Sequence, residues 1–228
     1  MKTHQKLTPK NKTKYVSSAT YACQYDIYKY RLNNTRLIWC KQVKKILKKN
    51  FNFSKNLKIN DFGCGYFPFY KELKLNNLKH NYLGLDGDKN ILQLGLKKFP
   101  ELKKKYKYYN IESYAPIRKA NISIVSSILE HLHEPKKVLE YIIKNTKDCL
   151  ILRIPISEKG SRNVIKEKKA NQAWYFNVLK KKDIIDQLEK NNFNLKFYID
   201  KASQENQIGS NLIKRLKRKI IILKAIKK

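Results

Sequence analysis

The stretch that decides the fold runs from Lys58 to Tyr70 and reads Lys-Ile-Asn-Asp-Phe-Gly-Cys-Gly-Tyr-Phe-Pro-Phe-Tyr. The apolar residues at its start predict a short buried strand over Leu57 to Phe62, and the two glycines predict a tight turn over 63–67. Pro68 indicates the first position of a helix, where the missing N–H of proline costs nothing. A strand, a glycine turn and a helix start in this order direct free backbone N–H groups toward a ligand beyond the carboxyl end of the strand.

The spacing of the glycines narrows the choice of ligand. A dinucleotide site needs Gly-x-Gly-x-x-Gly, but Pro68 stands at the sixth place after Gly63, which argues against a bound pyrophosphate. Read as Asp-x-Gly-x-Gly, segment 61–65 resembles the first motif of class I S-adenosylmethionine-dependent methyltransferases. Phe67 stands where this family usually has a third glycine. The resemblance implies that the cofactor S-adenosyl-L-methionine contacts Asp61, Gly63, Cys64 and Gly65.

A second strand and its loop extend the predicted cofactor site. Residues 81–86 predict a strand, and an acidic residue at the end of the second strand is placed to accept hydrogen bonds from both ribose hydroxyls. Asp86 stands there, while Asp88 predicts the N-cap of the next helix. Residues 105–111 predict a third strand, after which the resemblance implies contacts with the adenine. These positions add Asp86, Gly87, Asn110 and Ile111 to the predicted cofactor site.

A second segment carries the resemblance further, from Asn121 to Pro135. It predicts a buried strand over 122–126, a polar loop and a helix that begins at Pro135. The loop resembles the Leu-Glu-His-Leu motif of the family, which lies beside the transferring methyl group, and residues 149–155 resemble the fifth strand. The resemblance implies that the cofactor also contacts Ser126 and Ser127.

The same loop supplies the predicted catalytic pair. His131 is the only histidine expected at a strand end in the crevice, so it is the candidate base for a hydroxyl acceptor, and Glu130 is the candidate to orient it. Hydrogen bonding within the loop is the alternative role for both residues. Ser127 stands where ubiquinone-type O-methyltransferases have a metal-contacting Glu, so no metal site is predicted.

The last third of the chain predicts the acceptor region and the end of the sheet. Residues 157–172 predict a mobile polar substrate loop, followed by a helix over 181–190 and a strand from 191. Trp174 and Tyr175 are predicted to stack on a flat acceptor, with packing against a helix as the alternative. The tail over 218–226 is rich in β-branched residues and predicts an antiparallel strand in preference to a basic helix on a membrane surface.

Composition limits the remaining possibilities. A chain of 228 residues with 42% hydrophobic residues fits one domain with a modest extension. We expect a basic arm and a helical extension over residues 1–50 and a methyltransferase domain over 51–228. The four cysteines are scattered, which predicts reduced thiols and neither a zinc site nor disulfides. No apolar run is long enough to span a bilayer and no signal peptide is recognisable, so a cytoplasmic protein is expected.

The formal net charge of +33 has two interpretations. It favours nucleic acid, an anionic membrane surface or an acidic substrate as a partner. However, only 7 of the 51 basic residues are Arg, the side chain suited to bidentate phosphate contacts, and Lys recurs along the whole chain. A solvated lysine surface is therefore the preferred interpretation, and contact with nucleic acid or a membrane remains the alternative.

Together these features predict an α/β, Rossmann-like fold. The resemblance implies a seven-stranded, mostly parallel sheet with an antiparallel last strand, helices on both faces and an N-terminal helical extension. It also implies a methyltransferase that acts, at oxygen, on a small-molecule, lipid or cell-envelope acceptor. The alternatives are an RNA methyltransferase and a non-catalytic binding protein on the same scaffold. The oligomeric state stays open.

Overall fold

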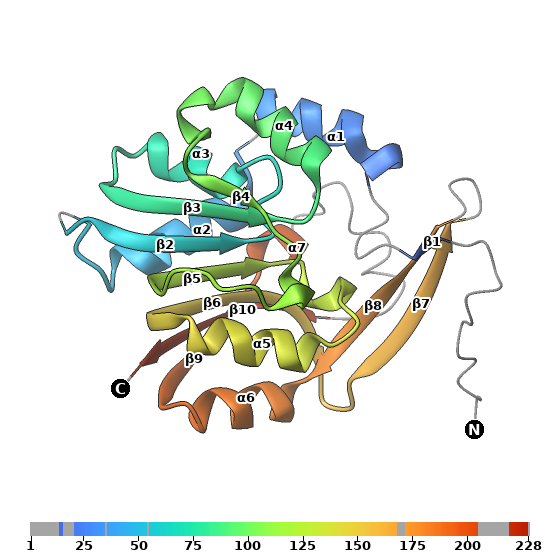
Figure 1. Ribbon diagram of the computed structural model, residues 1–228. Helices are drawn as coiled ribbons and strands as arrows, with labels where there is room; N and C mark the ends of the chain where they lie inside the picture. Colours follow the sequence, from blue (N-terminus) through green and yellow to red (C-terminus); the bar gives the residue numbers. More distant parts are fainter. Residues whose placement is uncertain are drawn as a thin grey trace.

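The central sheet has the predicted strands in one continuous order (Figure 1). The computed structural model describes residues 14–15, 21–34, 36–53, 55–167, 172–204 and 219–227. The strand order is β4-β3-β2-β5-β6-β10-β9, in which the first five strands are parallel and β10 is antiparallel to both of its neighbours. The strands are β2 (Leu57–Phe62), β3 (His80–Asp86), β4 (Tyr106–Tyr108), β5 (Ala120–Ser126), β6 (Thr146–Ser157), β9 (Phe193–Ile199) and β10 (Lys219–Lys227).

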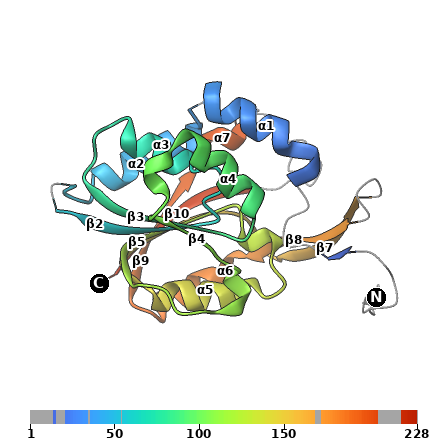
Figure 2. The same ribbon diagram turned by 45° about the horizontal axis from the view of Figure 1, so that its top comes forward.

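Helices cover both faces of this sheet, as both views show (Figures 1 and 2). One face packs against α2 (Ile38–Lys48), α3 (Pro68–Lys74) and α4 (Lys89–Lys98), and the other against α5 (Pro135–Lys144) and α6 (Lys181–Glu189). Successive residues in the middle of β5 and β6 alternate between the two cores, so the run from Cys149 to Leu152 is apolar on both faces, as expected for a buried parallel strand. Helix α1 (Tyr21–Asn34) contacts α4, and α7 (Lys201–Gln204) contacts α2.

Several local predictions are confirmed at residue level. Strand β2 has the predicted bounds, and Pro68 is the first residue of α3. The Asp88 carboxylate caps α4, because its Oδ1 accepts hydrogen bonds from the backbone N–H groups of Asn90 at 2.7 Å and Ile91 at 2.9 Å. The tail forms strand β10, not a helix, and Cys40, Cys64 and Cys149 are buried free thiols.

Two predictions about the loops are wrong. The segment predicted as a mobile substrate loop contains the end of β6 and a further strand, β7 (Ser161–Glu167), which pairs antiparallel with β8 (Gln172–Lys180). The polar, Lys-rich composition of this segment concealed the strand, because β7 is exposed over residues 161–164 and such a strand needs no apolar alternation. The third strand of the core is also shorter than predicted, since Ile111 begins the 3₁₀ turn η2 (Ile111–Ser113).

The hairpin of β7 and β8 extends the sheet beyond the seven core strands. The end of β8 pairs in parallel with the end of β6, and β1 (Lys14–Tyr15) pairs in parallel with the start of β8, giving ten strands in all. In Figure 1 this hairpin projects past the edge at which β2, β3 and β5 end. Apart from β1, the predicted arm of residues 1–20 lies outside the described residues. The boundary at residue 50 stays a prediction.

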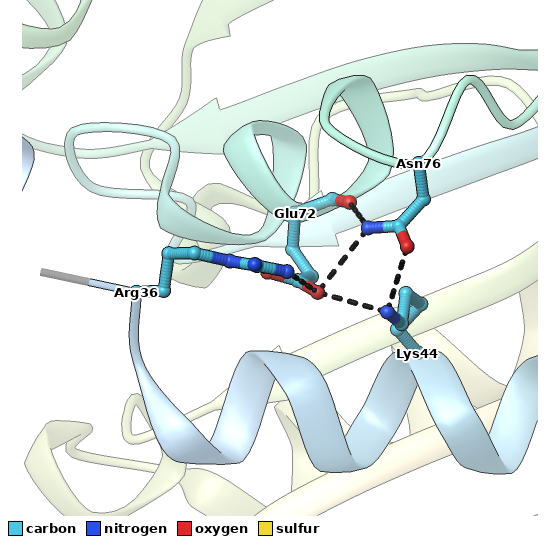
Figure 3. A network of polar contacts seen from close by, with 4 residues as sticks. All are labelled: Arg36, Lys44, Glu72 and Asn76. Atoms are coloured by element: carbon cyan, nitrogen blue, oxygen red, sulfur yellow. Dashed lines mark hydrogen bonds and ion pairs between the residues drawn. The ribbon is translucent and has the colours of Figure 1, made fainter.

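A polar network joins the helical extension to the rest of the molecule (Figure 3). The Glu72 side chain of α3 is only 2% exposed, and its carboxylate accepts bonds from the Arg36 guanidinium at 2.8 Å and the Lys44 ammonium at 3.1 Å. Asn76 completes the network by bonding to both Lys44 and Glu72. Burial by itself raises the pKa of Glu72, but the hydrogen bonds from Arg36 and Lys44 outweigh it and leave this pKa below its usual range. The network therefore fixes α2 against α3.

Candidate functional site

The glycine turn after β2 has the geometry that the sequence predicts. Gly63 and Gly65 take left-handed φ angles of 68° and 53°, which glycine adopts without a steric penalty. A Cβ on Gly63 would overlap the Ile128 side chain of the loop after β5, so these two loops meet at that glycine. The Gly63 N–H donates to the Leu85 carbonyl at 2.7 Å, and the Gly65 N–H donates to Asp86 Oδ2 at 2.8 Å. The turn is therefore tied to the end of β3.

Asp86 lies where a ribose-binding carboxylate is expected. The Asp88 N–H donates to its Oδ1 at 2.9 Å, so both carboxylate oxygens accept backbone hydrogen bonds, and the Gly87 N–H also stabilises the charged form. Burial raises the pKa of Asp86 to about 6, and the backbone bonds offset part of this effect. The carboxylate is thus held in one orientation beside the glycine turn.

Phe67 stands at the place of the family's third glycine, and its ring packs into the core and not against the Asp86 carboxylate. Its backbone takes the left-handed conformation that a glycine would adopt, with φ of 64°. Its ring is buried between β3 and α4: a Cβ added to Gly84 would lie 2.8 Å from the ring, and one added to Gly95 would lie 2.5 Å from it. These two glycines therefore make room for the ring inside the core, next to the rings of Tyr82 and Tyr106.

Asp61, the first residue of the motif, is buried in the core. Its Oδ2 accepts a hydrogen bond of 2.6 Å from the Tyr82 hydroxyl, a contact that the sequence motif does not reveal. Burial raises the pKa of Asp61 to about 7, although the bond from Tyr82 acts in the opposite direction. The structure therefore gives this carboxyl a role in joining β2 to β3, and its contact with a cofactor stays a prediction.

We expect the raised pKa of Asp61 to make the protein less stable as pH rises. The ordinary pKa of 3.8 applies in the unfolded chain and about 7 in the folded one, so between these values the folded state binds more protons. The free energy of unfolding then falls with pH, at up to about 1.4 kcal/mol per pH unit. Urea titrations between pH 5 and 7.5 should show a fall in wild type that is smaller in Asp61→Asn, because the amide has no charge to bury. Parallel curves for the two proteins would contradict this assignment.

The loop after β5 is fixed by a buried ion pair. Ser127 has a φ of 56°, and its Oγ accepts a bond of 2.6 Å from the Arg153 guanidinium of β6. Arg153 also donates at 2.8 Å to Asp200, whose side chain is fully buried. Since a buried charge needs a partner, Arg153 joins the loop after β5 to the segment that precedes α7.

Glu130 is the unsatisfied group of this loop. It is 4% exposed, and among the described residues its Oε2 has no hydrogen-bond partner. Burial raises the pKa of Glu130, and the nearby charges of His131 and Arg153 offset only part of this effect. A buried carboxyl oxygen without a partner is costly to maintain, which is the pattern expected where a ligand completes the hydrogen bonding.

His131 is positioned by strand β8. Its Nδ1 lies 3.2 Å from the Tyr175 carbonyl oxygen, and its ring contacts that of Phe176. Asn177, also on β8, holds the end of the same turn, because its Nδ2 donates to the Leu132 carbonyl at 2.8 Å. A carbonyl can only accept, so Nδ1 is the donor in this contact.

The remaining predicted residues lie at or near the same edge. The backbone N–H of Tyr109 donates to the Asp86 carbonyl at 2.8 Å, which brings the following Asn110 and Ile111 beside β3. Asn110 Oδ1 accepts from the Glu112 N–H at 3.1 Å and so caps η2. A Cβ on Gly87 would make only ordinary contact, so no steric need for glycine exists there. Cofactor contacts of Gly87, Asn110 and Ile111 stay predictions. The same holds for Cys64 and the half-buried Ser126.

The two predicted acceptor-stacking aromatics lie in β8. Tyr175 is half-buried, with its ring 3.9 Å from the Arg162 guanidinium and 5.4 Å from the His133 ring. The backbone of Trp174 pairs with Ile165 of β7, and its side chain lies outside the described residues. Tyr175 therefore already has neighbours on the hairpin, and stacking on an acceptor remains a prediction for both aromatics.

Sequence reasoning missed several residues that support the site. Arg153 was detectable, because a lone Arg within the apolar run from Cys149 to Pro155 signals a buried ion pair. No pattern in the neighbouring sequence marked Asp200, Tyr82 or Asn177, because each forms its hydrogen bond with a residue far away in the chain. Within the described part of the chain, no group of three or more His, Cys, Asp or Glu is placed to hold a metal, and no helix is long and apolar enough to cross a membrane.

Comparisons with known proteins agree with this architecture. No family model matches the chain, and no curated protein sequence matches it. Among solved structures, magnesium protoporphyrin IX methyltransferase from Synechocystis PCC 6803 with bound S-adenosylmethionine matches at a TM-score of 0.62 and 14% identity, covering 92% of this chain and 94% of that one. An S-adenosylmethionine-dependent methyltransferase structure from Listeria monocytogenes matches at 0.60 and 16%, covering 84% and 98%.

A third neighbour has the same fold within a longer chain. Phosphoethanolamine N-methyltransferase 2 of Haemonchus contortus, in complex with S-adenosylhomocysteine, matches at a TM-score of 0.66 and 13% identity, covering 91% of this chain and 59% of that one. At these identities the likeness establishes the fold. The chain has the fold of the class I S-adenosylmethionine-dependent methyltransferases.

Proposed function

We propose that this protein is an S-adenosylmethionine-dependent methyltransferase that acts at oxygen on a small-molecule, lipid or cell-envelope acceptor. The observation that carries the proposal is the Asp86 carboxylate, held by the Gly65 N–H at 2.8 Å beside a turn with two left-handed glycines. The similar structures bind this cofactor or its product but have different acceptors, among them a porphyrin and phosphomonomethylethanolamine. They therefore support the cofactor and leave the acceptor to experiment.

The residues at the carboxyl edge fit the parts of that cofactor. A carboxylate offers about four acceptor sites, more than the backbone bonds to Asp86 use, so Asp86 can also accept from a ribose hydroxyl. Ile111 offers an apolar surface for the adenine, and the glycine turn lets the backbone approach the amino-acid part closely. The ring of Phe67 leaves this space clear, because it lies in the core between β3 and α4.

The chemistry requires positioning more than reactive groups. When bound, S-adenosylmethionine supplies an electrophilic methyl group on a sulfonium. The loop after β5 and strand β8 would position an acceptor hydroxyl at this edge of the sheet. His131 Nε2 would accept the proton of that hydroxyl as a general base. The Tyr175 carbonyl would hold the Nδ1 side of the ring, which leaves Nε2 to face the acceptor.

A labelled-methyl assay tests the proposal and the role of His131 together. Purified protein with labelled S-adenosylmethionine is incubated with lipid, RNA and small-molecule fractions of whole cells. We expect label in the lipid or small-molecule fraction, and a rate about 10²–10⁴-fold lower for His131→Asn, which removes a general base. Calorimetry should show that this variant binds the cofactor as wild type does.

Two controls separate the possible failures. His133→Asn changes the neighbouring histidine, which lies next to Tyr175 but outside the turn, and should retain the wild-type rate. Label in RNA alone would replace the proposed acceptor class with RNA. Cofactor binding without any transfer would favour a non-catalytic scaffold, and no binding at millimolar cofactor would refute the proposal.

A further inference from the structure

Helix α2 presents a strongly basic face to solvent. Its buried residues, Cys40, Val43, Ile46 and Leu47, all face the core. The exposed side of the helix carries the α2 lysine face, which we define as Lys41, Lys45, Lys48 and Lys49. A hollow of about 510 Å³ lies over this face and is lined entirely by cationic side chains: Arg36, Lys41, Lys44, Lys45, Lys48 and Lys49.

No carboxylate in the described part of the chain neutralises the α2 lysine face. Helix α2 contains no acidic residue, and the nearby Glu72 is buried and already bonded to Arg36 and Lys44 (Figure 3). By contrast, α5 and α6 each pair a surface lysine with a carboxylate one turn away, in Lys144–Glu140 and Lys182–Asp186. Lysines four residues apart on one helix repel each other, so an anionic partner would stabilise α2.

Apolar side chains adjoin the lysines. A second hollow of about 500 Å³ continues from Lys48 and Lys49 to Phe51, Phe53 and Leu78. Leu75, which ends α3, is 55% exposed and precedes Asn76, the partner of Lys44. Cations with one exposed aliphatic side chain, Leu75, nearby match an anionic lipid surface, where the ammonium groups meet phosphates and the apolar group enters the headgroup boundary.

The same residues are less suited to nucleic acid. Single-stranded RNA needs aromatic rings that are free to stack on bases, but Phe53 is buried and Phe51 is half-buried. Arg36 is the only arginine that lines either hollow, and its guanidinium is engaged by Glu72. The remaining lysines act as point charges, which attract any phosphate surface without reading its sequence.

We propose that the α2 lysine face docks the protein on an anionic membrane surface. Clusters of about four to eight basic residues on an amphipathic helix are typical of such binding. Because α2 packs by its apolar face, it would lie against the lipid headgroups without leaving the fold. The proposal concerns a surface apart from the carboxyl edge of the sheet, so it does not depend on the proposed methyl transfer.

Vesicle sedimentation of the full chain tests this docking. The α2 variant replaces all four lysines of the face with Gln, and the matched control makes the same change at Lys97, Lys98, Lys103 and Lys104, which are exposed and line neither hollow. We expect wild type and the control to bind phosphatidylcholine vesicles that contain phosphatidylglycerol, and the α2 variant to bind them at least about tenfold more weakly. Leu75→Gln should weaken vesicle binding while leaving binding to heparin unchanged.

Three results would overturn the proposal. Equal weakening in the α2 variant and the matched control would show that only total charge matters. Equal binding of wild type to vesicles of phosphatidylcholine alone would remove the electrostatic argument. Tighter binding to a single-stranded RNA than to the anionic vesicles, lost in the α2 variant, would make the face a nucleic-acid surface.

Discussion

Replacing Asp86 by Ala is expected to weaken the binding of S-adenosylmethionine by at least about 100-fold. Two hydrogen bonds from ribose hydroxyls to a carboxylate are lost, each worth about 1.5–3 kcal/mol, and 1.4 kcal/mol corresponds to a factor of ten in affinity. The substitution also leaves the Gly65 N–H without the partner that holds the glycine turn. Titration calorimetry of wild type and variant measures the effect directly.

Asp88→Asn is the matched control for Asp86. It removes one negative charge two residues away, and Asn caps a helix about as well as Asp, so α4 should keep its start. We expect its cofactor affinity to stay within about twofold of wild type, because Asp88 donates only its backbone N–H to the site. Equal losses in both variants would show that net charge, not the ribose contact, governs binding.

The pH dependence of binding gives the same experiment a second readout. The pKa of Asp86 is raised to about 6 by burial, so its carboxylate becomes protonated as pH falls through that value. Hydrogen bonds to an ionised acceptor are stronger than those to a neutral one, and affinity should therefore fall below pH 6 in wild type. In the Asp86→Ala variant, this fall in cofactor affinity below pH 6 should be absent. An unchanged profile would indicate that the ribose is held elsewhere.

The second large effect is expected at Phe67, where Ala should destabilise the protein more than Gly. Phe67→Ala removes a buried ring and should lower the free energy of unfolding by about 3–5 kcal/mol. Phe67→Gly removes slightly more volume, but it relieves the left-handed backbone with φ of 64°, which costs a residue with a Cβ about 1–2 kcal/mol. Part of that gain is offset because glycine gives the unfolded chain more freedom. The net expectation is that Gly retains about 0.5–1 kcal/mol more stability than Ala.

Urea denaturation of the three proteins measures this order. In an ordinary helical or extended position Gly is the more destabilising residue, so the reverse order is specific to a left-handed backbone. Leu102 is fully buried in the same core and provides the matched control, where Ala should retain more stability than Gly. Finding Ala more stable than Gly at position 67 would contradict the left-handed conformation.

Cofactor binding by a Phe67 variant answers a separate question. The ring lies between β3 and α4, so Phe67→Leu should keep an affinity for S-adenosylmethionine within about threefold of wild type at a temperature where both proteins are folded. A large gain in affinity on removing the ring would mean that Phe67 obstructs the site. Having Phe67 in place of the third glycine would then weaken cofactor binding, although Gly84 and Gly95 leave room for its ring in the core.

The sequence by itself determined which segments form the first core strands and that the predicted site residues follow the carboxyl ends of those strands. The spacing from Leu57 to Pro68 predicts β2, the glycine turn and α3, and Asp88 predicts the start of α4. These features were readable because they depend on backbone conformation and on residues a few positions apart. The β-branched tail likewise predicts strand β10.

Only the tertiary structure decided what holds the site residues in place. Phe67 is accommodated by Gly84 and Gly95, and Asp61 is bonded by Tyr82, although nothing in the local sequence links these residues. Residues 157–172 are predicted as a loop but contain β7, and the contact of β8 with His131 is not predicted either. Such contacts join residues that are distant in the chain. Their positions follow from the way the strands and helices pack, which local spacing does not specify.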